Sequence, residues 1–543
     1  RLWVGTWGYG VVRLDNPGNV KQPGAHQYPY SANHFDTFYK IVHDPVTRTL
    51  WACTREGVCY LEEDIPNAEW KGYNSIGNNP LNFNNDIATD GQGNIWLCTQ
   101  NNGILQVNTQ PSMFKLWNLD KSHTQLTINY IYSILTTDGE NFWFGLNPYG
   151  IALHNRKTGK TLFNHDISDI AKRSNGEIWF ANNSYGVIVK PATGKPAFQL
   201  THETHPSIIQ DNFVNTLFES DDKIMWIGQR NGLSIVYSNN QGTAITMKEG
   251  KKDLTSCDIR HISQDKEGNI WLATDNEGII RISGNARNPK SLRCKQYSLA
   301  QRNFDIEDAT ACLEDSRGRL WAISNSGGLF LYNKVKDKFE PKNQEYHLSG
   351  DRMLTIKEDE NGNLWLTTDY ALVNIVWGKD SKKPQDIIYF TNEDGLGNVL
   401  FVPNTACQYG KELFFGSRTS FFSFVPSMKP QLGNSRKAKL VVTDVIVDGQ
   451  PFAKLDSAEK ADISKEMPAY TRQLIIPAGV KKFNVEFALL TYGNTEKNVY
   501  AYQLEGYDDD WQYCDKGVHK AAFQNLSSGT YYLKIKATDG YGK

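Results

Sequence analysis

The sequence has 543 residues, with 58 Lys and Arg against 60 Asp and Glu, which gives a formal net charge of −2. A near-neutral chain without basic blocks lacks the positive stripe of a nucleic-acid-binding protein, so that function class is excluded. Hydrophobic residues make up 39% and charged residues 22%, which is typical of a folded chain. There is no apolar run of about 18 residues, the length that a membrane-spanning helix needs. At about 150 residues per domain, this length predicts three or four domains.

One pattern recurs along the chain: a polar turn with Asp and Gly, a short strand with Trp, and a second Gly turn. It reads Asp90-Gly91-Gln92-Gly93-Asn94-Ile95-Trp96 and returns as Asp265-Lys266-Glu267-Gly268-Asn269-Ile270-Trp271. The anchor residues are Trp3, Trp51, Trp96, Trp143, Trp179, Trp226, Trp271, Trp321 and Trp365, with Phe414 as a degenerate tenth. A period near 45 residues with about four strand-length segments predicts β-propeller blades.

Ten units are too many for one ordinary ring, since propellers close with four to eight blades. We expect the last seven anchors to form one complete seven-bladed propeller over residues 112–426. Residues 1–111 would then hold three blades of a first propeller that is incomplete in this chain. Only one strand, Phe421–Val425, follows Phe414 before Pro426, so the last blade lacks an outer strand. The segment Ser112–Trp117 is predicted to supply that strand and close the ring.

A different pattern follows the propeller repeats. Residues 427–439 are polar and predict a linker, and no Trp-Gly repeat occurs after them. Strands are predicted at Leu440–Val447, Gln473–Ile476, Lys482–Leu490, Val499–Leu504 and Tyr531–Ala537. This pattern favours an immunoglobulin-like sandwich over 440–543 that ends about one strand short of closure. The predicted fold class is therefore all-β, with seven-bladed propellers followed by an immunoglobulin-like β-sandwich.

The eight cysteines form no CxxC pair and no Cys/His ligand cluster. Their even number leaves disulfides open for an exported protein. Cys53 and Cys98, however, stand two residues after an anchor Trp, where the repeat places mostly small residues. We therefore expect buried, reduced structural thiols and no metal site.

The repeats resemble those in the periplasmic sensor region of Bacteroides-type hybrid two-component regulators. The stretches Tyr500-Ala501-Tyr502-Gln503-Leu504-Glu505-Gly506-Tyr507 and Ser528-Gly529-Thr530-Tyr531-Tyr532-Leu533 resemble the tyrosine-rich Y_Y_Y module that ends such regions. The resemblance implies a periplasmic ectodomain of a membrane-anchored, homodimeric histidine kinase that detects an oligosaccharide and controls glycan-utilisation genes. Arg1-Leu2-Trp3-Val4-Gly5 has no Met and no signal-peptide pattern, so we expect a fragment or a processed ectodomain.

The sequence contains no recognisable catalytic motif. Gly-x-Ser-x-Gly, His-Glu-x-x-His and P-loop patterns are absent from the sequence. The acidic run Asp508-Asp509-Asp510 lacks the Gly and Glu of an EF-hand and is interpreted as a solvated turn. The repeated Asp before the Trp is interpreted as structural. We therefore expect no catalytic residue, cofactor or metal in these residues.

Candidate binding residues come from blade geometry. The loop after each Trp strand and the loop into the next innermost strand open on the same face, and binding residues concentrate on such loops. Aromatic faces beside Arg, Asp and Asn suit sugars, and Arg suits a carboxylate or sulfate group through paired hydrogen bonds. The predicted ligand-binding residues are Tyr149, Tyr185, Arg230, Arg260, Asp308, Arg352, Asp369, Tyr370 and Arg418.

Three functions stay open at this point. The first is a non-catalytic glycan sensor without nucleic-acid binding. The second is a glycan-cleaving hydrolase or lyase, for which Asp258, Asp308 and Asp351 are candidate acids. The third is a scaffold that binds a protein partner through a propeller face.

Overall fold

The computed structural model describes residues 1–19, 21, 24–28, 37–45, 47–62, 69–76, 79–81, 84–91, 93–109, 112–118, 130–147, 150–158, 161–164, 167–192, 194–246, 248–249, 252–300, 307–346, 348, 352–378, 383–397, 399–418, 420–426, 438–491, 495, 498–515 and 517–538. The chain folds into two compact units, one made of Arg1–Pro111 with Pro430–Lys543 and the other of Ser112–Lys429. The predicted all-β class is confirmed, since the described residues are mostly strands and contain one short α-helix, α1 (Ser457–Ile463).

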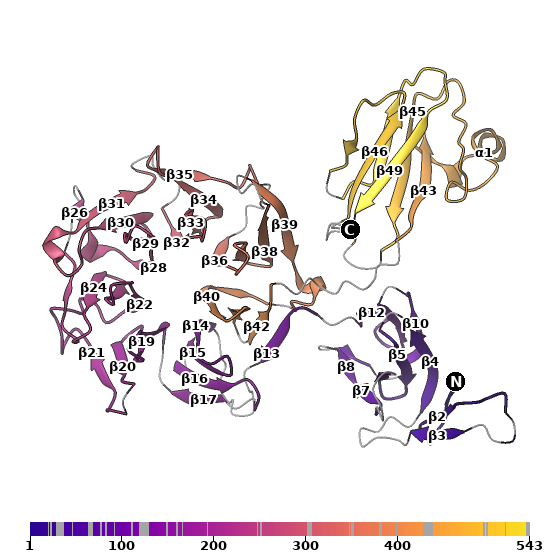
Figure 1. Cartoon of the computed structure of the whole chain (residues 1–543). Helices are drawn as coiled ribbons and strands as arrows, with labels where there is room; N and C mark the ends of the chain where they lie inside the picture. The colour runs from indigo at the N-terminus through magenta and orange to yellow at the C-terminus, as the bar shows by residue number, and fades with distance from the viewer. Residues whose placement is uncertain are drawn as a thin grey trace. The chain divides into compact units, whose positions relative to one another are not determined.

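Seven four-stranded antiparallel sheets make up the described part of unit Ser112–Lys429, and Figure 1 shows them arranged around one axis. In chain order these are β14 (Tyr130–Thr136), β15 (Asn141–Asn147), β16 (Gly150–Asn155), β17 (Thr161–Asn164); β18 (Asp169–Lys172), β19 (Ile178–Asn182), β20 (Gly186–Lys190), β21 (Phe198–Leu200); β22 (Val214–Glu219), β23 (Met225–Gln229), β24 (Gly232–Val236), β25 (Gly242–Ala244); β28 (Ile259–Gln264), β29 (Ile270–Thr274), β30 (Ile279–Ser283), β31 (Arg293–Tyr297); β32 (Ala309–Glu314), β33 (Leu320–Ser324), β34 (Gly328–Asn333), β35 (Lys338–Pro341); β36 (Met353–Glu358), β37 (Leu364–Thr368), β38 (Leu372–Trp377), β39 (Pro384–Phe390); and β40 (Phe401–Tyr409), β41 (Glu412–Ser417), β42 (Ser420–Phe424) with β13 (Lys115–Asn118). Outside these sheets lie a hairpin of β26 (Lys248–Glu249) and β27 (Lys252–Asp253) and the 3-10 turns Leu254–Ser256, Pro289–Ser291 and Asn392–Asp394.

The ring closes through strands from opposite ends of this unit. The innermost strands β14, β18, β22, β28, β32, β36 and β40 contact one another in that order, and β40 also contacts β14. The predicted pairing of the Phe114–Trp117 segment with the strand near Phe421 is confirmed, since Trp117 lies opposite Phe421 in the β13–β42 ladder. The Trp117 indole N–H also donates to Ser423 Oγ at 3.1 Å. The ring is thereby fastened by a ladder between residues about 300 positions apart in sequence.

The anchor Trp residues fill the spaces between neighbouring sheets. Five of them, Trp179, Trp226, Trp271, Trp321 and Trp365, have at most 2% of their surface exposed. Trp143 is only half-buried, and the Lys190 ammonium lies 4.8 Å from its ring centroid.

A single carboxylate organises the turn before the buried Trp. Asp265 Oδ1 accepts hydrogen bonds from the backbone N–H groups of Glu267 (3.0 Å) and Asn269 (2.8 Å). Its Oδ2 accepts from the side-chain amide of Asn269 (2.9 Å) and from the indole N–H of Trp271 (2.8 Å). Equivalent indole bonds of 2.9 Å join Trp321 to Asp315 and Trp365 to Asp359. The repeated Asp therefore fixes both the turn and the orientation of the Trp ring.

Three sheets side by side form the described part of residues 1–111. Their strands are β1 (Leu2–Gly5), β2 (Val11–Leu14) and β3 (Ala25–Tyr28); β4 (Phe38–Asp44), β5 (Thr49–Thr54), β6 (Val58–Glu62) and β7 (Lys71–Tyr73); β10 (Asn84–Thr89), β11 (Asn94–Thr99) and β12 (Ile104–Asn108); with a small hairpin of β8 (Ser75–Ile76) and β9 (Asn79–Pro80).

The prediction that Cys53 and Cys98 are buried is confirmed for only one of the two residues. Cys53 is buried against Ile87 and Leu97 of the following sheet. The expectation for Cys98 is wrong, because its side chain is exposed. This position of the repeat faces the next sheet in the series, and no fourth sheet follows Cys98 in the described part of residues 1–111. None of the eight cysteines, all of which lie in the described residues, forms a disulfide.

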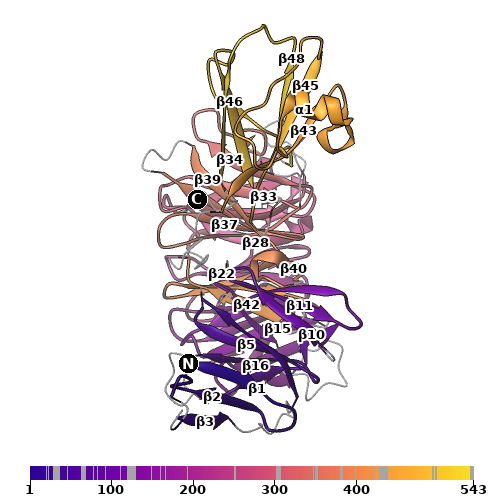
Figure 2. The same cartoon turned by 90° about the vertical axis from the view of Figure 1, so that its right-hand side faces the viewer.

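The C-terminal module has two sheets packed face to face. One contains β44 (Gln450–Pro451), β43 (Leu440–Val447), β45 (Lys482–Leu489) and β48 (Lys520–Gln524), and the other contains β47 (Gln512–Tyr513), β46 (Val499–Glu505) and β49 (Tyr532–Thr538). Figure 2 shows β46 apart from β43, β45 and β48, with α1 beside β43. The shared core includes Phe487 and Phe523 from the first sheet and Tyr500 and Leu504 from the second.

Two features of this module differ from the sequence-based expectations. The strand predicted at Gln473–Ile476 is wrong, because Ile475 N–H donates to Ile463 O at the end of α1, at 2.9 Å, in place of a ladder bond. Helix α1 was not predicted, and it follows a 3-10 turn at Phe452–Lys454. Asp456 accepts from Glu459 N (2.8 Å) and Glu459 accepts from Asp456 N (3.1 Å), so the Asp-x-x-Glu spacing was the available signal.

Replacement of a buried anchor Trp tests the packing of the sheets. We expect Trp271→Ala to lower the free energy of unfolding by about 3–5 kcal/mol as a core truncation. Trp7→Ala should cost less than about 1 kcal/mol, since Trp7 is 75% exposed. Urea denaturation followed by circular dichroism measures both, and equal losses would contradict the assignment of the anchor positions.

Removal of the turn carboxylate tests its structural role. Asp265→Ala leaves the indole N–H of buried Trp271 without its acceptor, so we expect a loss of about 2–3 kcal/mol in unfolding free energy. Glu267→Ala is the matched control in the same turn, because Glu267 is exposed and its carboxylate pairs with surface Lys334. The control should cost less than about 0.5 kcal/mol. A control as damaging as Asp265→Ala would show that the loss of stability does not come from the hydrogen bonds of Asp265.

Candidate functional site

A β-bulge recurs near the start of the innermost strands. The ladder register shifts around Tyr132, Asn215, Arg260, Thr310 and Leu354, each of which lies between two paired residues of its strand. Bulges re-aim a side chain and are frequent beside binding sites. All of these except Leu354 line the cavity at the centre of the ring.

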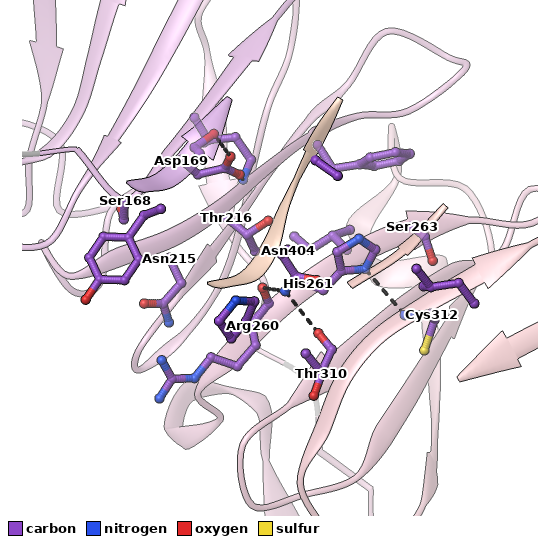
Figure 3. A pocket seen from close by; sticks show the side chains of 18 of the residues that line it. Ser168, Asp169, Asn215, Thr216, Arg260, His261, Ser263, Thr310, Cys312 and Asn404 are labelled. Carbon is purple, nitrogen blue, oxygen red and sulfur yellow. Dashed lines mark hydrogen bonds between the residues drawn. The ribbon is translucent and has the colours of Figure 1, made fainter. Parts of the chain in front are cut away.

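This central cavity has a volume of about 800 Å³ and is lined from all seven innermost strands or the loops leading into them. Such a volume is in the range of sites that hold small organic ligands. Polar groups dominate one level of its wall, to which Ser168 and Asn404 also contribute. Figure 3 shows Asn215, Arg260, Thr310 and Asn404 gathered at this level.

Strand β40 crosses towards the opposite side of the ring. Its ladder partners jump from Phe401 to Ala406, so the residues between them leave the sheet. Asn404 takes the left-handed conformation, with φ of 56°, which is strained for a residue with a side chain. Its amide donates to Thr310 O at 3.1 Å and to Arg260 O at 3.4 Å. The segment thereby ties β40 to β32 and β28, which are not its neighbours in the ring (Figure 3).

Two arginines, Arg260 and Arg352, are among the basic residues of the cavity wall. The guanidinium of Arg260 lies 2.7 Å from Asp258 and 3.4 Å from Asp275. Arg352 donates two bonds, of 2.9 and 2.7 Å, to the side-chain oxygen of Asn325. Since about half of the Arg352 side chain is exposed, its guanidinium is available to a ligand.

The carboxylates at the wall are held by protein donors. Burial raises the pKa of Asp258, against the effect of the neighbouring Arg260 charge. Asp308 accepts from the hydroxyls of Ser324, at 3.0 Å, and Ser326. Asp169 accepts from Leu217 N and Ile170 N, both at 2.8 Å, and from Ser133 Oγ at 3.0 Å. Burial raises the pKa of Asp169 against these hydrogen bonds.

Two family models match segments of this chain. Residues 253–276 and 347–370, which include Arg260 and Arg352, match the two component regulator propeller model. Residues 491–543 match the Y_Y_Y domain model. The chain carries two-component regulator propeller repeats and a Y_Y_Y domain.

Several known proteins are similar to this chain. Histidine kinase P4 of Formosa agariphila is 22% identical over 445 residues, which is 78% of this chain and 31% of that protein. The chain thus spans about a third of the length of this curated relative. The extracellular domain of a hybrid two component system from B. thetaiotaomicron superposes with a TM-score of 0.69 and 20% identity, over 99% of this chain and 69% of that one. A likeness at this identity shows that the fold is shared.

The structure brings three of the predicted site residues to the cavity of the regulator propeller: Arg260, Asp308 and Arg352. Asp369 lies behind Arg352, at 3.8 Å from its guanidinium. Four others do not line the cavity. Tyr185 and Tyr370 are 62% and 72% exposed, Arg230 lies over the ring of Phe213, and Arg418 lies over the ring of Tyr130. Tyr149 lies outside the described residues.

Sequence reasoning missed most of the bulged residues, although a signal for them exists. Each stands eleven positions before its anchor: Tyr132 before Trp143, Asn215 before Trp226, Arg260 before Trp271, Thr310 before Trp321, and Leu354 before Trp365. Ser168, which lines the cavity without a bulge, has the same offset from Trp179, and among these six residues Leu354 is the exception that does not line it. The offset is constant because the same hairpin joins the innermost strand to the Trp strand in every repeat. Position within the repeat therefore identifies cavity residues better than residue type in the loops.

In the described part of the chain, no helix has the length and apolar character to cross a membrane. No group of three or more His, Cys, Asp or Glu side chains in those residues is placed to hold a metal ion.

The bonds across the ring can be tested by removing the Asn404 side chain. Asn404→Gly keeps the left-handed backbone but loses the hydrogen bonds to Thr310 and Arg260. Asn240→Gly is the matched control, because Asn240 has φ of 61° and its side-chain oxygen has no hydrogen-bond partner. We expect Asn404→Gly to lower the unfolding free energy by about 1–2 kcal/mol more than the control in urea denaturation. Equal effects would show that the cross-ring bonds contribute nothing.

Proposed function

We propose that this chain is a non-catalytic, periplasmic ligand-sensing part of a hybrid two-component regulator, and that its ligand is an oligosaccharide bound in the central cavity. The observation that carries the proposal is the polar ring of bulged side chains around a cavity of about 800 Å³. It occurs inside a propeller whose repeats match the two component regulator family. The signal would control genes for use of the corresponding glycan.

The chemistry of the cavity wall supports a sugar ligand. Hydroxyl groups need closely spaced donors and acceptors, which Asn215, Thr310 and Arg352 provide from three different sheets. Sugar C–H faces need an apolar surface, and Tyr132 presents one, stacked at 5.9 Å between ring centroids against Tyr130. Ligand sites combine such apolar surface with a few polar groups that fix orientation.

The carboxylates near the cavity already accept hydrogen bonds or pair with an arginine, and this supports a binding role over a hydrolytic one. A glycosidase needs one carboxyl group that donates a proton and a second, about 5–10 Å away, that acts as nucleophile or base. Here Asp308 accepts from two serine hydroxyls, and Asp258 and Asp275 share Arg260. Incubation with candidate polysaccharides should therefore give no new reducing ends, and their appearance would favour the hydrolase.

The remainder of the proposal rests on the relatives. A histidine kinase relative of greater length and the extracellular domain with the same fold support a membrane-anchored parent protein. Signalling as a homodimer is a further part of the proposal. Light scattering with and without the bound oligosaccharide tests for the dimer. A protein that stays monomeric in both states would contradict that part.

A screen of oligosaccharides by thermal shift, followed by calorimetry on the best binder, tests the site. We expect Arg352→Ala to weaken binding at least tenfold, because the exposed guanidinium at the cavity loses its contact with the ligand. Arg418→Ala is the matched control, since Arg418 lies over Tyr130 without lining the cavity. The control should change the affinity less than twofold. An unchanged affinity in Arg352→Ala would place the ligand elsewhere.

A further inference from the structure

One position deep in the cavity carries a charge that its counterparts lack. The residue opposite each anchor in the innermost strand is Leu135, Ala171, Phe218, Ser263, Leu313, Lys357 or Cys407. Lys357 is the basic side chain in this set, and its neighbours around the level are apolar or small. Burial lowers the pKa of its ammonium group, because a cation there gives up part of its hydration unless another group compensates.

The described residues offer Lys357 no direct counter-ion. Its ammonium has no hydrogen bond or ion pair among them. The titratable groups that face it come from three other strands: Asp169 on β18, His261 on β28 and Cys407 on β40. The oxygens of Asp169 are already occupied by two backbone N–H groups and a serine hydroxyl. Burial raises the pKa of the Cys407 thiol to about 12, so Cys407 is neutral.

Hydrogen-bond donors surround the same space. Burial, aided by the Lys357 charge, lowers the pKa of His261 to about 3, so its ring is neutral. The backbone N–H of Cys312 donates to His261 Nδ1 at 3.5 Å, which leaves the proton on Nε2 (Figure 3). The buried hydroxyl of Ser263, two residues along the same strand, has no hydrogen-bond partner. A lysine, an imidazole N–H and a free hydroxyl therefore line one chamber.

We propose that this chamber binds an oxyanion, with Lys357 supplying the charge and His261 and Ser263 supplying hydrogen bonds. The oxyanion is either the carboxylate or sulfate of an acidic sugar or a free inorganic anion. If the oxyanion belongs to an acidic sugar, the inference rests on the proposed function, because the ligand of the cavity is then an acidic oligosaccharide. Bonds from charged donors to oxyanions are short and strong, and the low dielectric of a buried chamber strengthens them further.

The test uses the 543-residue protein and four probes: glucuronate, glucose, sulfate and chloride. Thermal shift at constant ionic strength and calorimetry measure binding. We expect saturable binding of glucuronate or sulfate and none of glucose or chloride at the same concentration. Glucuronate alone would identify a sugar acid as the source of the oxyanion, and sulfate alone would identify a free anion. No binding of either probe would overturn the inference.

Two lysine variants distinguish the chamber from the surface. Lys357→Met keeps the side-chain length and removes the charge, so we expect at least a tenfold loss of oxyanion affinity. Without probe it should melt at or above the wild-type temperature, because a desolvated cation is removed. Lys334→Met is the matched control, since Lys334 is exposed and paired with Glu267, and it should bind as the wild type does.

Two results separate this inference from the proposed function. If Lys357→Met binds the oxyanion as tightly as the wild type does, the inference about the chamber is overturned, and the proposal of oligosaccharide sensing is unaffected. Loss of neutral-oligosaccharide binding in Arg352→Ala, together with no oxyanion effect at Lys357, would support the proposed function and refute the chamber.

Discussion

The hydrogen bonds that orient the buried Trp indoles are the interactions on which the ring depends, and before Trp271, Trp321 and Trp365 an Asp carboxylate in the turn makes them. In the turn of Asp265, two backbone N–H groups, an asparagine amide and the Trp271 indole all donate to the same side chain. This fixes the hairpin and aims the indole into the space between two sheets. Sheets that lack this Asp use other acceptors: Trp226 donates to Ser220 Oγ and Trp179 to Glu177 Oε2, both at 3.1 Å. The acceptor varies, and the orientation of the ring is kept.

The site follows from the same repeat. Because the hairpin has a constant length, the bulged residue stands at a constant distance from the anchor, and every bulged residue except Leu354 lines the central cavity. Packing between sheets is carried by the Trp face, so residue type at the bulge is free to vary without loss of the ring. Tyr132, Asn215, Arg260 and Thr310 occupy equivalent positions with different chemistry. Because different residues pack the sheets and line the cavity, a propeller can change its ligand while it keeps its fold.

Sequence reasoning was strongest where periodicity carries the information. The spacing of the anchors and the missing outer strand after Phe414 led to the β13–β42 ladder, which the structure contains. It was weaker where a single side chain or a bulge decides the outcome. The path of Asn404 across the ring depends on residues that leave the ladder between Phe401 and Ala406, which no periodicity marks.

Other differences have equally local causes. Residue type in loops suggested Tyr185 and Tyr370, but these lie on exposed turns outside the cavity. Lys357 was not singled out, because a lysine in an alternating strand is usually solvated, and only the ring turns this position inward. In the C-terminal module, the segment of Ile475 bonds to the end of α1 and so cannot form the strand that its apolar residues suggested.

A crystal structure of the protein saturated with its best-binding oligosaccharide tests the central claim most directly. The account predicts sugar density inside the ring, with ligand oxygens within hydrogen-bond distance of Arg352 and of at least one bulged residue among Tyr132, Asn215 and Thr310. The seven sheets should keep the ladders seen here. A sugar bound on the outer strands of the ring or on the C-terminal module, with the central cavity free of it, would contradict the account.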